Sequence, residues 1–118
     1  MYTVGLQQLI DKMRLENCTP EVDIDSIEIS QTDVNRPALQ LAGFFDHFDS
    51  NRIQVIGYVE HTYMQKMERD HGIGILTKIF EYKVPCIVFC RYLDIHEDII
   101  ELATKYGVPI LRSKKTTS

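Results

Sequence analysis

The chain has 118 residues, of which 44% are hydrophobic and 25% are charged, so it fits one globular domain with its own core and not a disordered segment. Its formal net charge of −4 provides no general attraction to nucleic acid or to an anionic membrane, and no window approaches the roughly 18 apolar residues of a transmembrane helix. The three cysteines cannot all pair with one another, and two of them lie within an apolar run, which favours a reducing, cytoplasmic environment.

The N-terminal segment is predicted to form one helix and two short strands. Apolar residues recur with a helical period over residues 4–15, which predicts a helix with Thr3 as its N-cap. A short strand is predicted over residues 15–18, followed by a surface connection over 19–25. A second strand over 24–30 then leads into a turn over 30–33.

The central stretch, residues 35–57, contains the densest set of conformationally special residues. Pro37 has a fixed φ and pushes Arg36 toward an extended conformation. The spacing i, i+3, i+4 and i+7 then predicts a short helix whose apolar stripe is Leu41, Phe44, Phe45 and Phe48. Residues 49–51 form a turn cluster, and the β-branched run over 52–57 predicts a buried strand.

Helices and strands alternate through the second half of the chain. A helix is expected after Gly57, and residues 69–74 break it. Within this break, residues 71–74 form a loop or begin the next short helix, which is predicted over 75–82. A continuous apolar strand over 84–90, a helix capped by Asp94 and ended by Gly107, and a last strand over 108–111 follow. The alternation predicts an α/β fold with three α/β/α layers and a mixed, mostly parallel sheet.

The sequence carries no recognisable catalytic motif. The pattern GxxxxGK[ST], whose amides and lysine hold phosphates, occurs nowhere in the chain. Cys86 and Cys90 are predicted to be buried apolar residues on one face of their strand. The histidines lack metal-site spacing and are predicted to be surface residues: His47, His61, His71 and His96. We therefore expect no catalytic residue, no metal site and no cofactor in this chain.

Four residues near strand ends are candidate ligand-binding residues: Asn35, Arg36, Arg52 and Thr62. A guanidinium group suits phosphate or carboxylate because it donates two parallel hydrogen bonds. The alternative is local pairing, of Arg36 with Asp33 or a helix C-terminus and of Arg52 with Asp49. Thr62 follows a strand that opens into a helix, where α/β domains place ligands, or it caps that helix.

The central stretch also carries three short motifs: Asn35-Arg36-Pro37, Gly43-Phe44-Phe45 and RIQVIG over residues 52–57. Together they resemble the N-terminal domain of bacterial HPr kinase/phosphorylase. The resemblance covers essentially the whole chain, through residues 108–112 and 117–118, and departs at Ala38, where the family usually has glycine. Each tripeptide alone would be weak, whereas the combination is specific.

This resemblance implies a domain over residues 1–112, similar to the uridine-nucleotide-binding first domain of the Mur ligases, with residues 113–118 leading toward a C-terminal kinase domain. It implies a non-catalytic accessory role beside a kinase/phosphorylase that uses ATP or pyrophosphate to phosphorylate a serine of HPr in carbon catabolite control. In such a parent, ATP and Mg²⁺ belong to the kinase domain, HPr is the partner, and the enzyme is hexameric and cytoplasmic. The alternative function is a sensing module for a nucleotide or sugar phosphate, since residues 35–36 and 43–45 loosely echo the Ser-Arg and Gly-x-x-Phe pattern of the Mur site.

Overall fold

The computed structural model describes residues 3–30, 33–91 and 93–114. Within these ranges the main sheet has the strand order β2-β7-β6-β5-β4, with β2 antiparallel to β7 and the other neighbours parallel. The main-sheet strands are β2 (Glu16–Asn17), β4 (Val34–Asn35), β5 (Ile53–Ile56), β6 (Ile87–Phe89) and β7 (Ile110–Arg112). A separate antiparallel pair joins β1 (Val4–Gly5) to β3 (Glu28–Ile29). The predicted mixed, mostly parallel sheet is confirmed.

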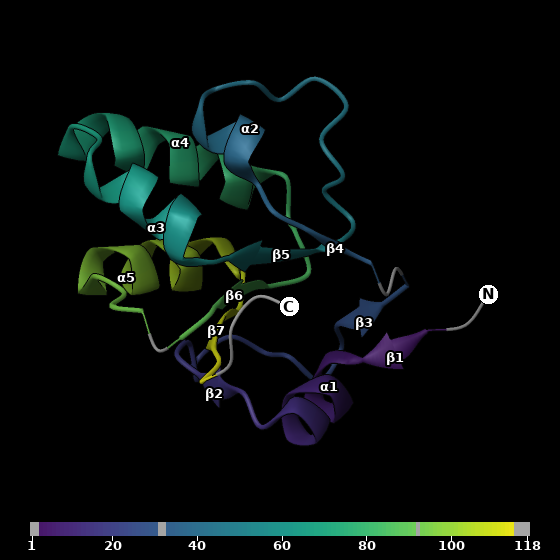
Figure 1. Cartoon of the computed structure of the whole chain (residues 1–118). Coiled ribbons are helices and arrows are strands. Elements are labelled where there is room, and N and C mark those ends of the chain that lie inside the picture. The colour runs from purple at the N-terminus through teal and green to yellow at the C-terminus, as the bar shows by residue number, and fades with distance from the viewer. Residues whose placement is uncertain (1–2, 31–32, 92, 115–118) are drawn as a thin grey trace.

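The helices cover both faces of the main sheet. They are α1 (Leu6–Met13), α2 (Ala38–Leu41), α3 (Tyr58–Gln65), α4 (Arg69–Glu81) and α5 (Glu97–Tyr106). Figure 1 shows α2 to α5 on one side of the sheet, and α1 with β1 and β3 on the other. The predicted three layers are therefore present, although the similarity to the Mur ligases stays a prediction.

Alternate residues of the strands supply two separate hydrophobic clusters. Ile87 and Phe89 of β6 face the cluster under α4 and α5, whereas Val88 between them faces the cluster over α1. In β7, Ile110 likewise faces the cluster under α4 and α5, and Leu111 faces the cluster over α1. This follows from the two-residue period of a strand, and it explains why β6 is apolar at every position.

The parallel strands β4, β5, β6 and β7 lie side by side in chain order, and each connection contains helix on the same face. Right-handed connections place helices in this way when the chain crosses the sheet in one direction. The parallel part consequently has no point at which the strand order reverses, where α/β sheets usually open a ligand crevice. A crevice of that kind is therefore not expected in the parallel part of the sheet.

The central helix is shorter than predicted. α2 ends at Leu41, because Gly43 adopts a left-handed conformation with φ 93°. The Gly43 N–H donates to the Gln40 carbonyl and the Phe44 N–H to the Leu39 carbonyl, both at 2.9 Å, which is the Schellman arrangement that terminates helices. The apolar spacing of Phe44, Phe45 and Phe48 was thus not helical. Phe45 and Phe48 instead pack against each other edge to face, with ring centroids 5.7 Å apart.

Several predicted boundaries are also corrected. The N-caps are Gly5 and His96, not Thr3 and Asp94. Residues 69–74 belong to α4, which confirms the alternative that residues 71–74 begin the next helix, and the Glu68 carboxylate caps this helix by accepting two amides. Residues 19–25 are not merely a surface connection, since Thr19 is fully buried and its hydroxyl accepts the Ile110 N–H at 3.0 Å. The second strand is only β3, and the predicted turn and C-terminal tail lie partly outside the described residues. Gly107 does end α5, with φ 73°.

Candidate functional site

Arg36 is held by a buried carboxylate at the carboxyl end of the sheet. Its Nη2 donates to Glu60 Oε1 at 2.9 Å, and the same oxygen accepts the Gly57 N–H at 2.7 Å. Glu60 lies in the first turn of α3 and is 5% exposed, whereas the Arg36 side chain is 45% exposed. The expected partners of Arg36, Asp33 or a helix C-terminus, are therefore wrong. The carboxylate links the end of β4 to the start of α3.

Asn35 takes part in an internal amide network. Its Nδ2 donates to Gln54 Oε1 at 2.6 Å, and Gln54 is fully buried in β5. The Gln54 Nε2 in turn donates to the carbonyls of Arg52, at 2.8 Å, and Asp49, at 3.1 Å. A buried amide must have such partners, so this network fixes the turn that precedes β5.

The remaining two candidates lie elsewhere. Arg52 precedes β5 and pairs with Asp49 at 3.9 Å, which confirms its local interpretation. The β4–β5 register aligns Asn35 with Gln54, so Arg52 lies toward the amino end of the sheet and Arg36 toward its carboxyl end. Thr62 lies within α3 and is half-buried, so its predicted capping role is wrong. The structure thus brings Asn35 and Arg36 together but not the whole set, and ligand binding by these residues stays a prediction.

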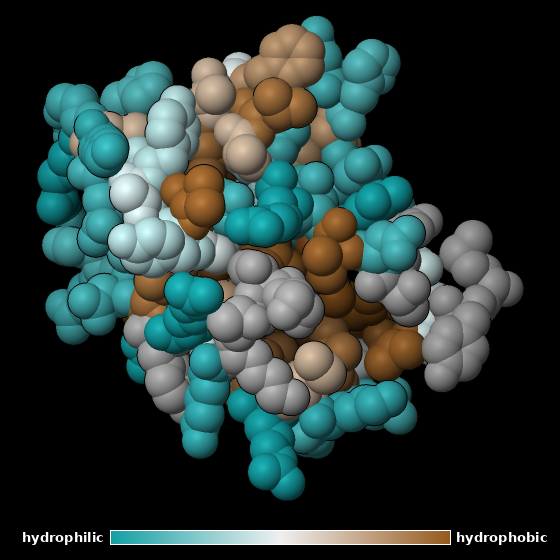
Figure 2. Space-filling model, in the orientation of Figure 1, coloured by the Kyte–Doolittle hydropathy of each residue, from teal (hydrophilic) through white to brown (hydrophobic). Residues whose placement is uncertain are grey.

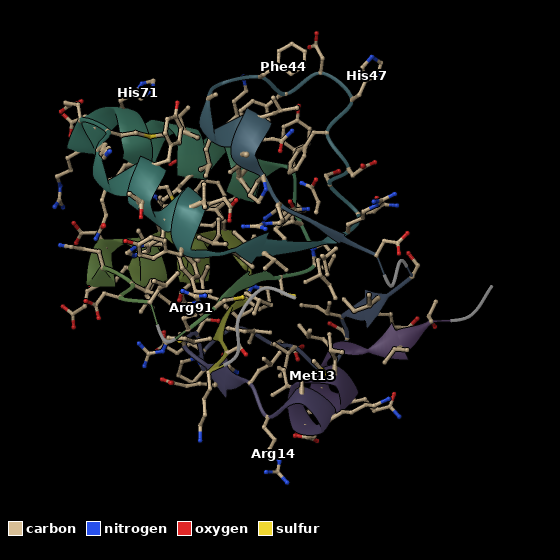
Figure 3. All side chains as sticks on the ribbon, in the orientation of Figure 1. Met13, Arg14, Phe44, His47, His71 and Arg91 are labelled. Atoms are coloured by element: carbon tan, nitrogen blue, oxygen red, sulfur yellow. The ribbon has the colours of Figure 1, made fainter. Side chains whose placement is uncertain are left out.

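A small pocket of about 270 Å³ adjoins Arg36, and sequence reasoning missed most of its lining. Cys90 and Arg91 come directly after β6, and Tyr58 and Val59 begin α3. Burial raises the pKa of the Cys90 thiol, Arg36 and Arg91 act to lower it, and Glu60 raises it. Figure 3 shows Arg91 at this end of the sheet, where its backbone is left-handed with φ 56°. The signal that could have found these residues is their position immediately after two apolar strands.

A larger cavity, of about 520 Å³, opens between α3, α4 and α5 beside the last residue of β6. Its lining is mostly apolar with a polar rim: His61, Met64, Gln65, Met67, Glu68, Arg69, Gly72, Ile73, Leu76, Phe89, Asp94, Ile95, His96, Asp98 and Ile99. His61 is half-buried and its Nε2 lies 2.8 Å from the Asp94 carbonyl oxygen, whereas His47, His71 and His96 are exposed as predicted. The sequence had no motif that would have indicated this cavity.

Apolar side chains also reach the surface near α2 and α3. Tyr58 and Tyr63 are 61% and 45% exposed, whereas Met67 packs against the core. Leu39 and Phe44 are likewise exposed, and Figure 2 shows brown patches over this region. Among the described residues, no helix has the length and apolar character needed to cross a membrane. Over the same ranges, no three His, Cys, Asp or Glu residues gather into a group that could hold a metal ion.

Comparison with known proteins agrees with the resemblance seen in the motifs. A family model described as HPr Serine kinase N terminus matches residues 4–118. A protein named HPr kinase/phosphorylase from Lachnoclostridium phytofermentans is 65% identical over 118 residues, and one of the same name from Alkaliphilus metalliredigens is 36% identical. Each comparison covers 100% of this chain and 38% of the relative, so the chain spans little more than a third of the length of these relatives.

A solved structure shares the fold at much lower sequence identity. It contains the CBS and DRTGG domains of the regulatory region of Clostridium perfringens pyrophosphatase, complexed with the activator diadenosine tetraphosphate. The TM-score is 0.64 at 17% identity, covering 96% of this chain and 42% of that one. Because the family model matches nearly the whole chain and the relatives align along its full length, the chain belongs to the HPr serine kinase N-terminal family.

Proposed function

We propose that this chain is a non-catalytic accessory domain of an HPr kinase/phosphorylase. The observation that carries the proposal is the match of its full length to the N-terminal part of proteins of that name. The absence of a phosphate-binding loop from the sequence agrees with it, because phosphoryl transfer depends on amides and a lysine around the phosphates.

The parent protein would phosphorylate a serine of HPr with ATP or pyrophosphate and remove that phosphate again, in control of carbon catabolism. ATP and Mg²⁺ would bind in its kinase domain, and HPr would be its protein partner. The parent would be a cytoplasmic hexamer, to which this domain contributes regulation or support. The names of the relatives support the kinase/phosphorylase activity toward HPr, and the other assignments rest on the resemblance alone.

A phosphotransfer assay with radiolabelled ATP and purified HPr tests the proposal. The isolated chain should transfer no label, whereas the full-length parent should label HPr, and an HPr variant with its target serine replaced by alanine should stay unlabelled. Deleting residues 1–112 from the parent should leave chemistry at the kinase domain but alter its rate or its response to effectors. Robust turnover by the isolated chain would contradict the proposal, as would a deletion with no effect on any kinetic parameter.

A second candidate function is the sensing of a nucleotide or sugar phosphate, favoured by the guanidinium groups of Arg36 and Arg91 beside one small pocket. The structural neighbour offers a precedent, since it is a regulatory region in complex with the activator diadenosine tetraphosphate. Calorimetry with uridine nucleotides at millimolar concentration measures this. Arg36→Ala should abolish any binding, whereas Arg52→Ala, at the other end of the sheet, should leave it intact. If the natural chain shows neither a heat of binding nor a change in melting temperature with these nucleotides, this second function is excluded.

A further inference from the structure

The cavity between α3, α4 and α5 has the dimensions and the floor of a small-molecule site. Its volume of about 520 Å³ lies within the roughly 300–1,000 Å³ of typical ligand pockets. Phe89 and Leu76, which line it, are 1% and 3% exposed, so the cavity reaches down to the core. Met64 and Met67 line the α3 side, and methionine side chains adapt to flat rings through favourable sulfur–aromatic contacts.

Carboxylates of the protein itself lie at the rim of this cavity. α4 and α5 both begin at this cavity, and a helix N-terminus ordinarily attracts an anion. The Glu68 carboxylate accepts the Asp70 and His71 amides at 3.2 and 3.0 Å, so the start of α4 is occupied. At the start of α5, His96 Nδ1 accepts the Asp98 N–H at 3.3 Å, and the Asp98 carboxylate forms an ion pair with Arg69. A phosphate would find these positions taken.

The overall charge of the lining favours the same conclusion. Three carboxylates, those of Glu68, Asp94 and Asp98, accompany the single guanidinium of Arg69 when the histidines are neutral. The exposed Asp94 carboxylate and Gln65 amide lie at the rim and, within the described ranges, have no hydrogen-bond partner in the protein, so both can orient a ligand that enters the cavity. An uncompensated carboxylate attracts a cation, accepts hydrogen bonds from a neutral donor and repels an anion.

We propose that this cavity binds a flat, mainly apolar small molecule that is neutral or cationic, and that it rejects phosphate esters and other anions. The site is distinct from the Arg36 pocket, and the proposal does not depend on the role of the parent enzyme. The ligand would lie between the side chains of Met64 and Met67 and the start of α5, with a donor group directed at Asp94.

Three ligands that share an indole ring separate charge from shape. Indole, tryptamine and indole-3-acetate are neutral, cationic and anionic, and each is titrated into the ¹⁵N-labelled chain while amide shifts are followed by NMR. We expect indole and tryptamine to shift amides around the cavity, in α3, the first half of α4 and the start of α5. Tryptamine should bind at least about fivefold more tightly than indole-3-acetate, since one charge at close range in water is worth that factor.

Two glycines of α4 provide a matched pair of variants. A Cβ at Gly72 would meet Met67 at 3.8 Å, an ordinary contact, and Gly72 lines the cavity. A Cβ at Gly74 would meet nothing within 4 Å beyond the neighbouring helix backbone, and Gly74 does not line the cavity. Gly72→Leu should fill the cavity and abolish binding, and Gly74→Leu should bind as the natural chain does, with circular dichroism confirming that both fold. Asp94→Asn should reduce the ratio of affinities for tryptamine and indole-3-acetate, which provides a test even if Gly72→Leu fails to fold. Equal binding by both glycine variants, tighter binding of indole-3-acetate, or no shifts with any of the three compounds would overturn the proposal.

Discussion

The buried carboxylate of Glu60 offers the sharpest test of how the sheet end is held together. In Glu60→Ala, the buried Gly57 N–H loses its acceptor, which costs about 1–3 kcal/mol. The lost ion pair with Arg36 adds at most about 1 kcal/mol, because Arg36 is 45% exposed and water can solvate the freed guanidinium. We therefore expect a total loss of about 1–4 kcal/mol in the free energy of unfolding.

Glu60→Gln separates the two contributions. The amide oxygen can still accept the Gly57 N–H, so only the charge is lost and the expected cost is about 1 kcal/mol. Urea denaturation followed by circular dichroism measures both variants. A double-mutant cycle with Arg36→Ala should give a coupling of about 1 kcal/mol, whereas Arg52→Ala, whose pair with Asp49 spans 3.9 Å, should cost under about 0.5 kcal/mol. The reasoning is refuted if Glu60→Gln costs as much as Glu60→Ala, or if Glu60→Ala is neutral.

Three further predictions concern backbone conformation, core cysteines and alkaline pH. Gly107→Ala should destabilise the chain by about 1 kcal/mol, because alanine is strained at φ 73°. Gly74→Ala, at an exposed position within α4, should stabilise it by about 0.5–1 kcal/mol, because alanine favours the helix more than glycine does. Thermal melts should therefore show a lower Tm for the first variant and a higher Tm for the second. Ellman's reagent at pH 8 should label half-buried Cys18 first and Cys86 only on unfolding, since burial raises the pKa of Cys86 to about 12; equal labelling rates in the native chain would contradict this. The Cys86 thiol titrates near 9.0 in the unfolded state, so the unfolded state loses this proton at a lower pH than the folded state does. Ionisation of Cys86 therefore lowers the free energy of unfolding progressively between about pH 9 and pH 12 and has no effect below pH 9. In Cys86→Ala, the urea midpoint should fall less steeply with pH over that range.

The parts of the fold that were predicted correctly are those with a strong local signal. β5 and β6 are apolar at nearly every position because both faces of the sheet are covered, and that pattern is visible in the chain. Gly107 could be assigned as a helix stop because glycine adopts the left-handed conformation without strain. The wrong boundaries involved competing signals of similar strength. Glycine at Gly43 ended α2 although the phenylalanines beyond it continued a helical spacing.

The candidate site was predictable only in part. Arg36 was singled out by its position beside Asn35 near a strand end, but its partner Glu60 is 24 residues away in sequence. Likewise, the cavity is formed by three helices whose spacing depends on the packing of their apolar faces. No short sequence pattern encodes such a spacing, so neither the ion pair nor the cavity could be derived from the residues alone.

The amino-acid sequence by itself determined the class of fold and the family, because strand apolarity, helix-ending glycines and the motifs around Asn35 are local properties of the chain. Only the tertiary structure decided which charges meet, since a carboxylate such as Glu60 acquires its partners when β4 and α3 come together. The tertiary structure also decided where the large cavity opens. Because the parallel strands follow one another in a single direction across the sheet, this cavity arises from the packing of α3, α4 and α5 and not from a reversal of strand order.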